Sequence, residues 1–247
     1  MKLEIAVQDV EGLAVARQQG ADRAELCQAL GTGGLTPTTG MVARAAELGL
    51  PARVLIRPRG GGYLYSGAEV AAMDHDVRAL LDAGASGVII GALDDRGLDH
   101  RSLDRLVRAA QGMPVVVHRC VDVVLAAGLA EADSLVALLV ELGVDGLLTS
   151  GGAPTAAEGA ETIAELVGAS AGRLEVIAGG GVRAQHVPSL AEAGADVVHL
   201  SAGAPTSHGS PGPGGGEGSY MTTSPELVAA ARAAVDAQPG RSARPRP

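Results

Sequence analysis

Polar side chains that can bind anions, metal ions or protons follow several short apolar segments of this chain. Glu25 and Cys27 end one such segment, and Arg57 and Arg59 follow another. Arginine is suited to bidentate recognition of carboxylate or phosphate groups. A carboxylate near arginines stays ionised, so it can orient them or accept a proton. These residue types predict a polar site for a small anionic molecule.

A third segment ends in His118, and Cys120 and Asp122 come directly after it. An imidazole titrates near neutral pH and can act as a general acid or base. The candidate catalytic residues are therefore Glu25, Arg57, Arg59, His118 and Asp122.

Each of these side chains also has a structural interpretation. Glu25 can pair with Arg57 as an ion pair inside the fold, and His118 can be a buried histidine with satisfied partners. Arg59 can be a solvated loop residue. Cys27 can be a small buried hydrophobic residue rather than a ligand. The sequence leaves these alternatives open, because it does not show which face of a strand each side chain occupies.

Three glycine-rich turns follow later apolar segments. Glycine permits positive φ and close approach of the backbone, and successive backbone N–H groups can hold an anion. The expected anion-binding residues are Ser150, Gly151, Gly152, Gly180, Gly181 and Ser201. The alternative is that these glycines only make tight turns.

The elements that must position these residues alternate along the chain. Strand-like apolar runs occupy residues 3–7, 22–26, 53–56, 87–90, 115–117, 146–148, 174–178 and 197–200. Helical patterns cover residues 10–19, 37–48, 68–83, 102–110, 134–142, 156–169, 185–193 and 225–237. Eight strand-then-helix units predict an α/β fold, a single (β/α)8 TIM barrel, in which polar residues at strand carboxyl ends share one rim. A doubly wound open sheet is the alternative, but residues 8–12 lack its dinucleotide fingerprint.

The expected barrel spans residues 1–238. Residues 203–223 are rich in glycine, proline and serine, which predicts a mobile loop after the last strand, either a lid over the site or an idle surface loop. Residues 239–247 are expected to be a disordered tail.

The composition limits the function classes. The net charge is −9 and no basic cluster is present, which argues against nucleic acid as a partner. No apolar run is long enough to span a membrane, and no signal peptide is evident, so we expect a cytoplasmic protein. The two cysteines are expected to be free thiols. The sequence leaves the choice between a monomer and a homo-oligomer open.

The motifs resemble those of the CutC family, named for copper homeostasis. They lie at residues 20–27, 33–38, 56–59, 118–122, 148–152, 179–182 and 199–202. The resemblance implies a (β/α)8 barrel and copper handling, with Cys27 as a Cu(I) ligand because thiolate suits Cu(I). Cys120 stands where the family more often has alanine, and it is a candidate second metal ligand.

Two functions therefore compete. The first is a cytoplasmic copper-homeostasis protein that binds Cu(I). The second is a TIM-barrel enzyme that acts on a small anionic or phosphorylated metabolite at the carboxyl ends of the strands.

Overall fold

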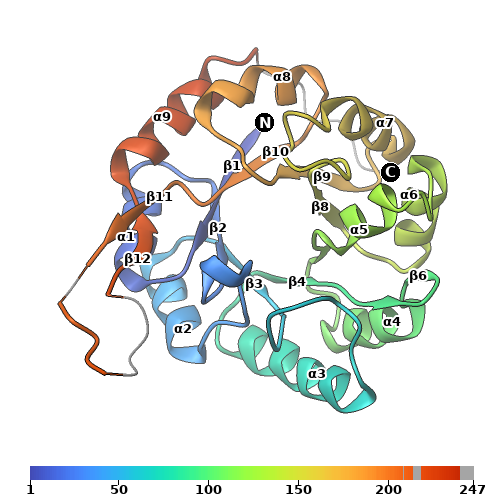
Figure 1. Cartoon of the computed structure of the whole chain (residues 1–247), viewed down its shortest axis with the longest axis horizontal. Coiled ribbons are helices and arrows are strands. Elements are labelled where there is room, and N and C mark those ends of the chain that lie inside the picture. The colour runs from blue at the N-terminus through green and yellow to red at the C-terminus, as the bar shows by residue number, and fades with distance from the viewer. Residues whose placement is uncertain (208, 214–217, 240–247) are drawn as a thin grey trace.

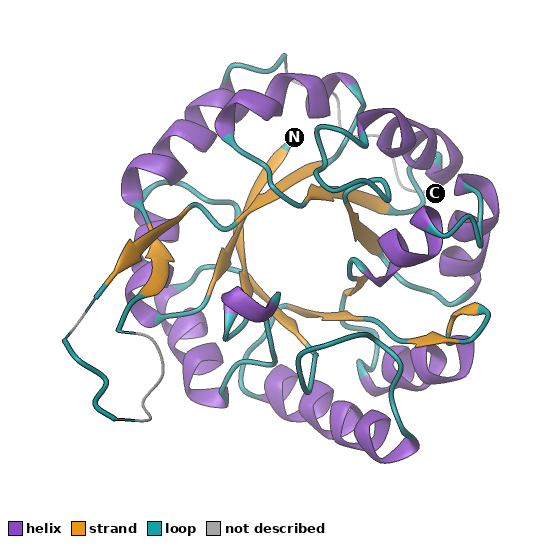
Figure 2. Ribbon diagram, in the orientation of Figure 1, coloured by secondary structure: helices purple, strands orange, loops and turns teal. Residues whose placement is uncertain are grey.

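Eight parallel strands close into a barrel that a ring of helices surrounds (Figures 1 and 2). The computed structural model describes residues 1–207, 209–213 and 218–239. The barrel strands are β1 Lys2–Val7, β2 Arg23–Leu26, β3 Ala52–Leu55, β4 Gly87–Ile90, β7 Val115–Val117, β8 Gly146–Thr149, β9 Glu175–Gly179 and β10 Val197–Leu200. Each strand pairs with the next barrel strand along the chain, and β10 closes on β1. The predicted single (β/α)8 TIM barrel is confirmed.

The outer helices begin at capping residues and end at turns that the sequence specifies. They are α1 Val10–Gln18, α2 Thr39–Leu48, α3 Gly67–Asp82, α4 His100–Ala109, α5 Cys120–Ala126, α6 Ala132–Glu141, α7 Ala160–Ser170, α8 Val187–Glu192 and α9 Pro225–Asp236. Asp9 and Thr38 cap the first two by accepting hydrogen bonds from backbone N–H groups. Gly49 ends α2 with a φ of 67°, a conformation that glycine adopts without strain.

Strand side chains alternate between two apolar clusters. The outward positions pack against the helices in one large cluster of Val, Leu, Ile and Ala. The inward positions form a smaller cluster inside the barrel, made of Cys27, Leu55, Ile89, Val116, Leu148, Ile177 and Val197. Because successive residues of a strand face opposite sides, this register also decides which polar residues enter the barrel.

Three parts of the structure differ from the sequence-based expectation. A short helix, α5, directly follows β7, where only residues 134–142 were expected to be helical. Helix α7 begins at Ala160 rather than near residue 156. Two small antiparallel ribbons are added to the barrel, β5 Leu93–Asp94 with β6 Gly97–Leu98 and β11 Gly203–Thr206 with β12 Tyr220–Thr223. The valine-rich sequence of α5 has strand-like composition, which hid the helix.

The β11–β12 ribbon occupies both ends of the segment that was expected to be a mobile loop. Residues 208, 214–217 and 240–247 lie outside the described residues, so the mobility of this loop and the disorder of the tail stay predictions. No helix in the described ranges is long and apolar enough to cross a membrane.

A buried ion network fills the amino-terminal part of the barrel interior. Arg23 binds Glu4 and also Glu175, with 3.0 Å between its Nη1 and the Oε1 of Glu175. Arg53 donates from Nη1 to the Oε2 of Glu175 at 2.8 Å. All four side chains are buried, and buried charges are tolerated only when they are paired.

The network makes the fold sensitive to loss of one charge. In Glu175→Gln, Arg23 and Arg53 lose their shared carboxylate, so we expect the free energy of unfolding to fall by about 3–5 kcal/mol in urea denaturation. The exposed control Glu192→Gln is expected to stay within about 0.5 kcal/mol of the wild type. Equal stabilities of the two variants would contradict this account of the barrel interior.

Candidate functional site

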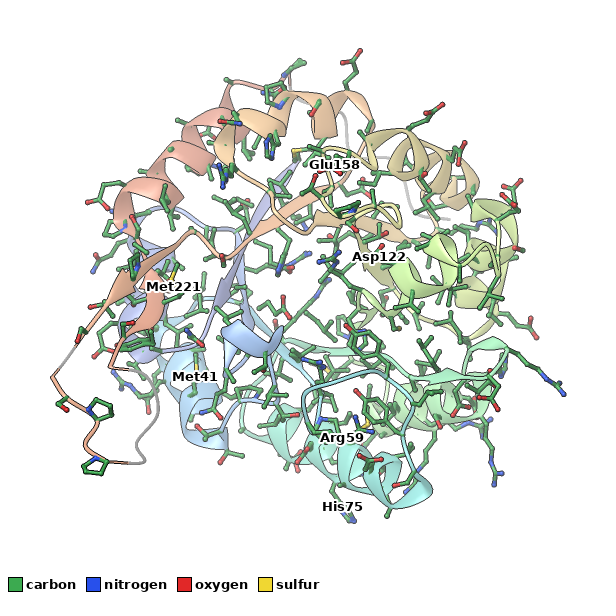
Figure 3. The ribbon with its side chains drawn as sticks, viewed as in Figure 1. Met41, Arg59, His75, Asp122, Glu158 and Met221 are labelled. Carbon is green, nitrogen blue, oxygen red and sulfur yellow. The ribbon has the colours of Figure 1, made fainter. Side chains whose placement is uncertain are left out.

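A cavity of about 970 Å³ opens at the carboxyl ends of the barrel strands. This is the face on which TIM-barrel enzymes carry their active sites. Its polar lining includes Glu25, Arg57, Tyr63, His118, Arg119, Asp122, His199 and Ser201. The side chains that fill the centre of the barrel are visible in Figure 3.

A row of three side chains from adjacent strands lies at one wall of the cavity, which Glu25 and His199 line while Glu4 is buried behind His199. Glu4 of β1 lies opposite His199 of β10 in the strand register, and β1 also pairs with β2, which carries Glu25. His199 lies between the two carboxylates: its Nδ1 is 2.9 Å from Oε1 of Glu4, and its Nε2 is 3.0 Å from Oε2 of Glu25. Sequence reasoning missed Glu4 and did not include His199 among the site residues.

Burial and charge act in opposite directions within this row. Burial favours the neutral carboxyl of Glu4, but the hydrogen bond from His199 and the charge of Arg23 outweigh it and lower the pKa of Glu4 to about 2. Burial raises the pKa of Glu25, and the charge of Glu4 adds to this effect. Burial disfavours the charged form of His199, but the two carboxylates overcome it and raise the pKa of His199.

Arg57 enters the barrel mouth but is held by the backbone. Its guanidinium donates to the carbonyl oxygens of Thr32 at 2.8 Å, Gly34 at 2.7 Å and Gly61 at 2.7 Å. It also lies over the ring of Tyr63, at 5.4 Å from the ring centre. Arg57 therefore fixes two loops and brings a positive charge to the cavity.

The alternative in which Glu25 forms an ion pair with Arg57 is wrong. The ion-pair partner of Glu25 is His199, and the guanidinium of Arg57 is directed to backbone carbonyls. The loop glycines supplied acceptors that the sequence pattern did not reveal.

His118 is a buried, neutral histidine. The backbone N–H of Cys120 donates to its Nδ1 at 3.1 Å, which places the ring proton on Nε2. Burial and the nearby charge of Arg57 lower the pKa of His118 to about 3. Its ring packs against Tyr63 with 4.7 Å between the ring centres. A role as a general acid or base near neutral pH therefore has no support from this geometry, and the ring is suited to donating a hydrogen bond.

Asp122 organises the loop that follows β8. Its carboxylate accepts hydrogen bonds from the Thr149 hydroxyl at 2.5 Å, the backbone N–H of Ser150 at 3.0 Å and the backbone N–H of Gly152 at 3.1 Å. It also accepts one from Nε of Arg119 at 2.7 Å. The backbone donors of Ser150 and Gly152, which the sequence predicted to bind an external anion, are directed at a carboxylate of the chain itself, and the N–H of Gly151 donates to the Thr149 hydroxyl.

The glycines of this loop serve a tight turn. Gly151 has a φ of 72°, and a Cβ at that position would lie 2.3 Å from the carbonyl oxygen of Gly159. Gly152 does not line the large cavity either, since it faces a small hollow beside Ala126 and Glu131. The alternative that we kept for these glycines, a purely structural turn, describes them better.

The donors that remain open at the cavity belong to Arg119 and the turns after β9 and β10. Gly180, Gly181 and Ser201 line the cavity, and their backbone N–H groups have no acceptor in the described part of the chain. A Cβ on Gly180 would lie 3.0 Å from Nη1 of Arg119, and the φ of Gly180 is 111°, a conformation that glycine adopts without strain. Asp122 and Ser150 hold the other nitrogens of Arg119. The sequence did not single out Arg119, because an arginine beside a strand end can equally be a solvated surface residue.

Arg59 lies apart from the others. It is exposed, pairs with Glu69 and donates to the carbonyl of Leu64, and it does not line the cavity. Figure 3 shows Arg59 over α3, whereas Asp122 lies beside the barrel mouth.

The two cysteines occupy different environments. Cys27 lines the cavity within the inner apolar cluster, whereas Cys120 packs in the outer cluster and does not line the cavity. Burial raises the pKa of both thiols, which disfavours the thiolate that binds metal.

In the described residues, the group with metal-ligand spacing is Glu4, Glu25 and His199, and it contains no thiol. The donor set does not fit Cu(I).

The state of His118 can be checked directly. Since its pKa is lowered to about 3, we expect ¹⁵N NMR to show a neutral ring with the proton on Nε2 at every pH from 5 to 8. The unfolded chain binds this proton at about pH 6.5 and below, so His118 contributes to stability above that pH, and the contribution is lost as the pH falls toward 3. A ring that titrates near pH 6.5 in the folded protein would contradict the assignment.

Comparisons with known proteins identify the family of this chain. The sequence profile of the CutC family matches residues 1–204. A CutC protein of Rhizobium meliloti is 42% identical over 191 residues, which cover 77% of this chain and 76% of the relative. A CutC protein of Xylella fastidiosa is 43% identical over 203 residues, which cover 81% of this chain and 74% of the relative.

Solved structures include a CutC protein with the same fold. A CutC protein of Streptococcus agalactiae, to which a role in copper homeostasis is ascribed, superposes with a TM-score of 0.75 and 27% identity, covering 81% of this chain and 99% of the other. The 3-hexulose-6-phosphate synthase of Salmonella typhimurium superposes with a TM-score of 0.57 over 95% of this chain and 98% of the other, but at 20% identity it shows the fold alone. By its sequence and its fold, this chain belongs to the CutC family.

Proposed function

We propose that this chain is an enzyme that acts on a small anionic metabolite bound in the barrel mouth. One observation carries the proposal: Arg119 and the open N–H groups of Gly180, Gly181 and Ser201 line the same cavity as Glu25 and His199. A site with anion donors at one part and an ionisable pair at another can both hold a substrate and act on it.

Arg119 is suited to recognising the anion. Its Nε is bound to Asp122 and its Nη2 to Ser150, so the guanidinium is held in place before a ligand arrives. Nη1 has no acceptor in the described part of the chain and lies beside Gly180. A guanidinium that is already oriented loses less conformational freedom when it binds a carboxylate or phosphate.

Glu25 is suited to the reacting end of the ligand. Its carboxylate is 6% exposed and accepts no hydrogen bond from the described residues, although it lies against His199. Burial raises its pKa, although the charge of His199 opposes that rise, and a carboxyl group in contact with a ligand can exchange a proton with it. Glu25 is therefore the group that we assign to contact with the reacting part of the metabolite.

A copper-homeostasis function is the second candidate, and the ascribed role of the Streptococcus agalactiae protein favours it. The one structural observation on its side is that the Cys27 thiol lines the cavity. A buried thiol with a raised pKa and no second thiol in the cavity lining is a weak Cu(I) site. Both cysteines are free, which suits a reducing compartment such as the cytoplasm.

The copper candidate has a direct test. We expect the reduced protein and the Cys27→Ser variant to compete equally and weakly with a Cu(I) chelator under anaerobic conditions. The reason is that burial raises the pKa of this thiol and that no second thiol lines the cavity. Tight binding of Cu(I) that disappears in Cys27→Ser would favour the copper-homeostasis function over the enzymatic function.

The anion site is tested with inorganic phosphate as the probe. We expect saturable binding by the metal-free protein in NMR titration, with shifts at Gly180, Gly181 and Ser201. Arg119→Gln removes the charged hydrogen bonds, so phosphate affinity is expected to fall about 10- to 100-fold. Arg119→Lys keeps the charge, so its phosphate affinity is expected to lie between those of the wild type and Arg119→Gln.

The matched control is Arg101→Gln, which removes one exposed arginine on α4 and leaves the cavity intact. It is expected to bind phosphate as the wild type does. Equal losses in the Arg101 and Arg119 variants would show that net charge, and not the cavity, attracts the anion.

A further inference from the structure

Two side chains of the metal-binding types face each other at the cavity without an aligned hydrogen bond. Nε2 of His199 and Oε2 of Glu25 are 3.0 Å apart, and both residues line the cavity. Glu25 is 6% exposed and has no hydrogen-bond donor in the described part of the chain. A buried carboxylate needs a positively charged partner, and either protonated His199 or a cation held between Glu25 and His199 supplies that charge.

The separation of these two atoms suits a shared metal ion. Two ligand atoms that each lie ~2.1 Å from an ion, at right angles to each other, are ~3.0 Å apart. The observed 3.0 Å between His199 and Glu25 agrees with that arrangement. With Glu4 included, the ligand atoms of the three residues all lie within 4.8 Å of one another.

Glu4 supplies the support that metal-binding histidines usually have. Nδ1 of His199 is 2.9 Å from Oε1 of Glu4, so Nδ1 is held by a carboxylate and Nε2 is turned toward Glu25. Such a carboxylate fixes the ring and makes the other nitrogen a better ligand. Arg23 in turn binds Glu4 on the amino-terminal side of the barrel interior.

The charges of the barrel interior leave room for a cation. The buried network holds three carboxylates and two guanidinium groups, contributed by Glu4, Glu25, Glu175, Arg23 and Arg53. Lys2 reaches Glu175 only at 3.9 Å and is 61% exposed, so water screens its charge. Within these five side chains the carboxylates outnumber the guanidinium groups by one, and Arg57, the other buried guanidinium at the cavity, is directed to backbone carbonyls. Protonated His199 or a bound cation can supply the balancing charge.

We propose that Glu25 and His199 form a site for a divalent transition-metal ion of the class that prefers nitrogen and oxygen ligands, such as Co²⁺ or Mn²⁺, with Glu4 as the positioning residue. The remaining coordination positions face the cavity, where water or an oxygen of the metabolite can bind. A set of imidazole and carboxylate suits these ions, whereas Cu(I) prefers the thiolate and thioether ligands that this set lacks. The site goes beyond the proposed function, because it requires no anion to form.

Titration of the metal-free, full-length protein with Co²⁺ tests this site, followed by calorimetry and visible absorption. We expect one Co²⁺ per chain, with the weak absorption of nitrogen and oxygen ligands and without an intense thiolate band. Glu25→Gln keeps the side-chain volume, and it is expected to weaken Co²⁺ binding at least about 100-fold. Glu4→Gln is expected to weaken it about 10- to 100-fold, because the ring loses its support.

Cys27→Ser is the control variant, since it removes the cavity thiol and leaves Glu25 and His199 in place. It is expected to bind Co²⁺ as the wild type does. Absence of saturable binding, unchanged affinity in a folded Glu25→Gln variant, or a thiolate band that disappears in Cys27→Ser would each overturn the proposal. Thermal unfolding of every variant checks the fold. Phosphate binding by the metal-free chain is measured separately, so the anion site and the metal site can fail independently.

Discussion

The charges inside the barrel must neutralise one another, and this constraint determines how the rest of the site is arranged. Glu175 binds Arg23 and Arg53 on the amino-terminal side, and Arg23 also binds Glu4. Buried ions are tolerated only in such paired arrangements. The strand register places these side chains on the inner face, so the network is a consequence of alternation along β1, β2, β3 and β9.

The network connects the interior to the cavity through Glu4. Because Arg23 fixes Glu4, and Glu4 fixes Nδ1 of His199, the second nitrogen of His199 reaches the cavity wall in a defined orientation beside Glu25. On the opposite side of the cavity, Asp122 plays a comparable part for Arg119. In both cases a carboxylate that is itself held by other residues orients a side chain that faces the ligand space.

The fold could be predicted from the sequence because its signals are local. Apolar runs followed by helical patterns repeat eight times, and glycines such as Gly49 end helices where the chain must turn. Helix α5 was missed because a short valine-rich stretch does not show a helical period. The ends of the segment at residues 203–223 form a ribbon whose pairing is not local in sequence.

The site was only partly predictable. Glu25, Arg57, His118 and Asp122 were found because they stand at strand ends, and the structure brings them to one cavity. Their partners depend on contacts between distant strands, which no local pattern reveals. Glu4 is an example: within the apolar strand β1 it looks like a solvent-facing residue, yet it is fully buried. The donors of Ser150 and Gly152 were predicted to be open, but Asp122 occupies them.

The most direct test of the account is a crystal structure of the protein grown with Mn²⁺, examined by anomalous scattering at the manganese edge. The account predicts one anomalous peak at the cavity wall, ~2.1 Å from Nε2 of His199 and a carboxylate oxygen of Glu25, with Glu4 bound to Nδ1. A cavity without a peak, in which a proton alone joins His199 and Glu25, would contradict it, as would a peak at Cys27.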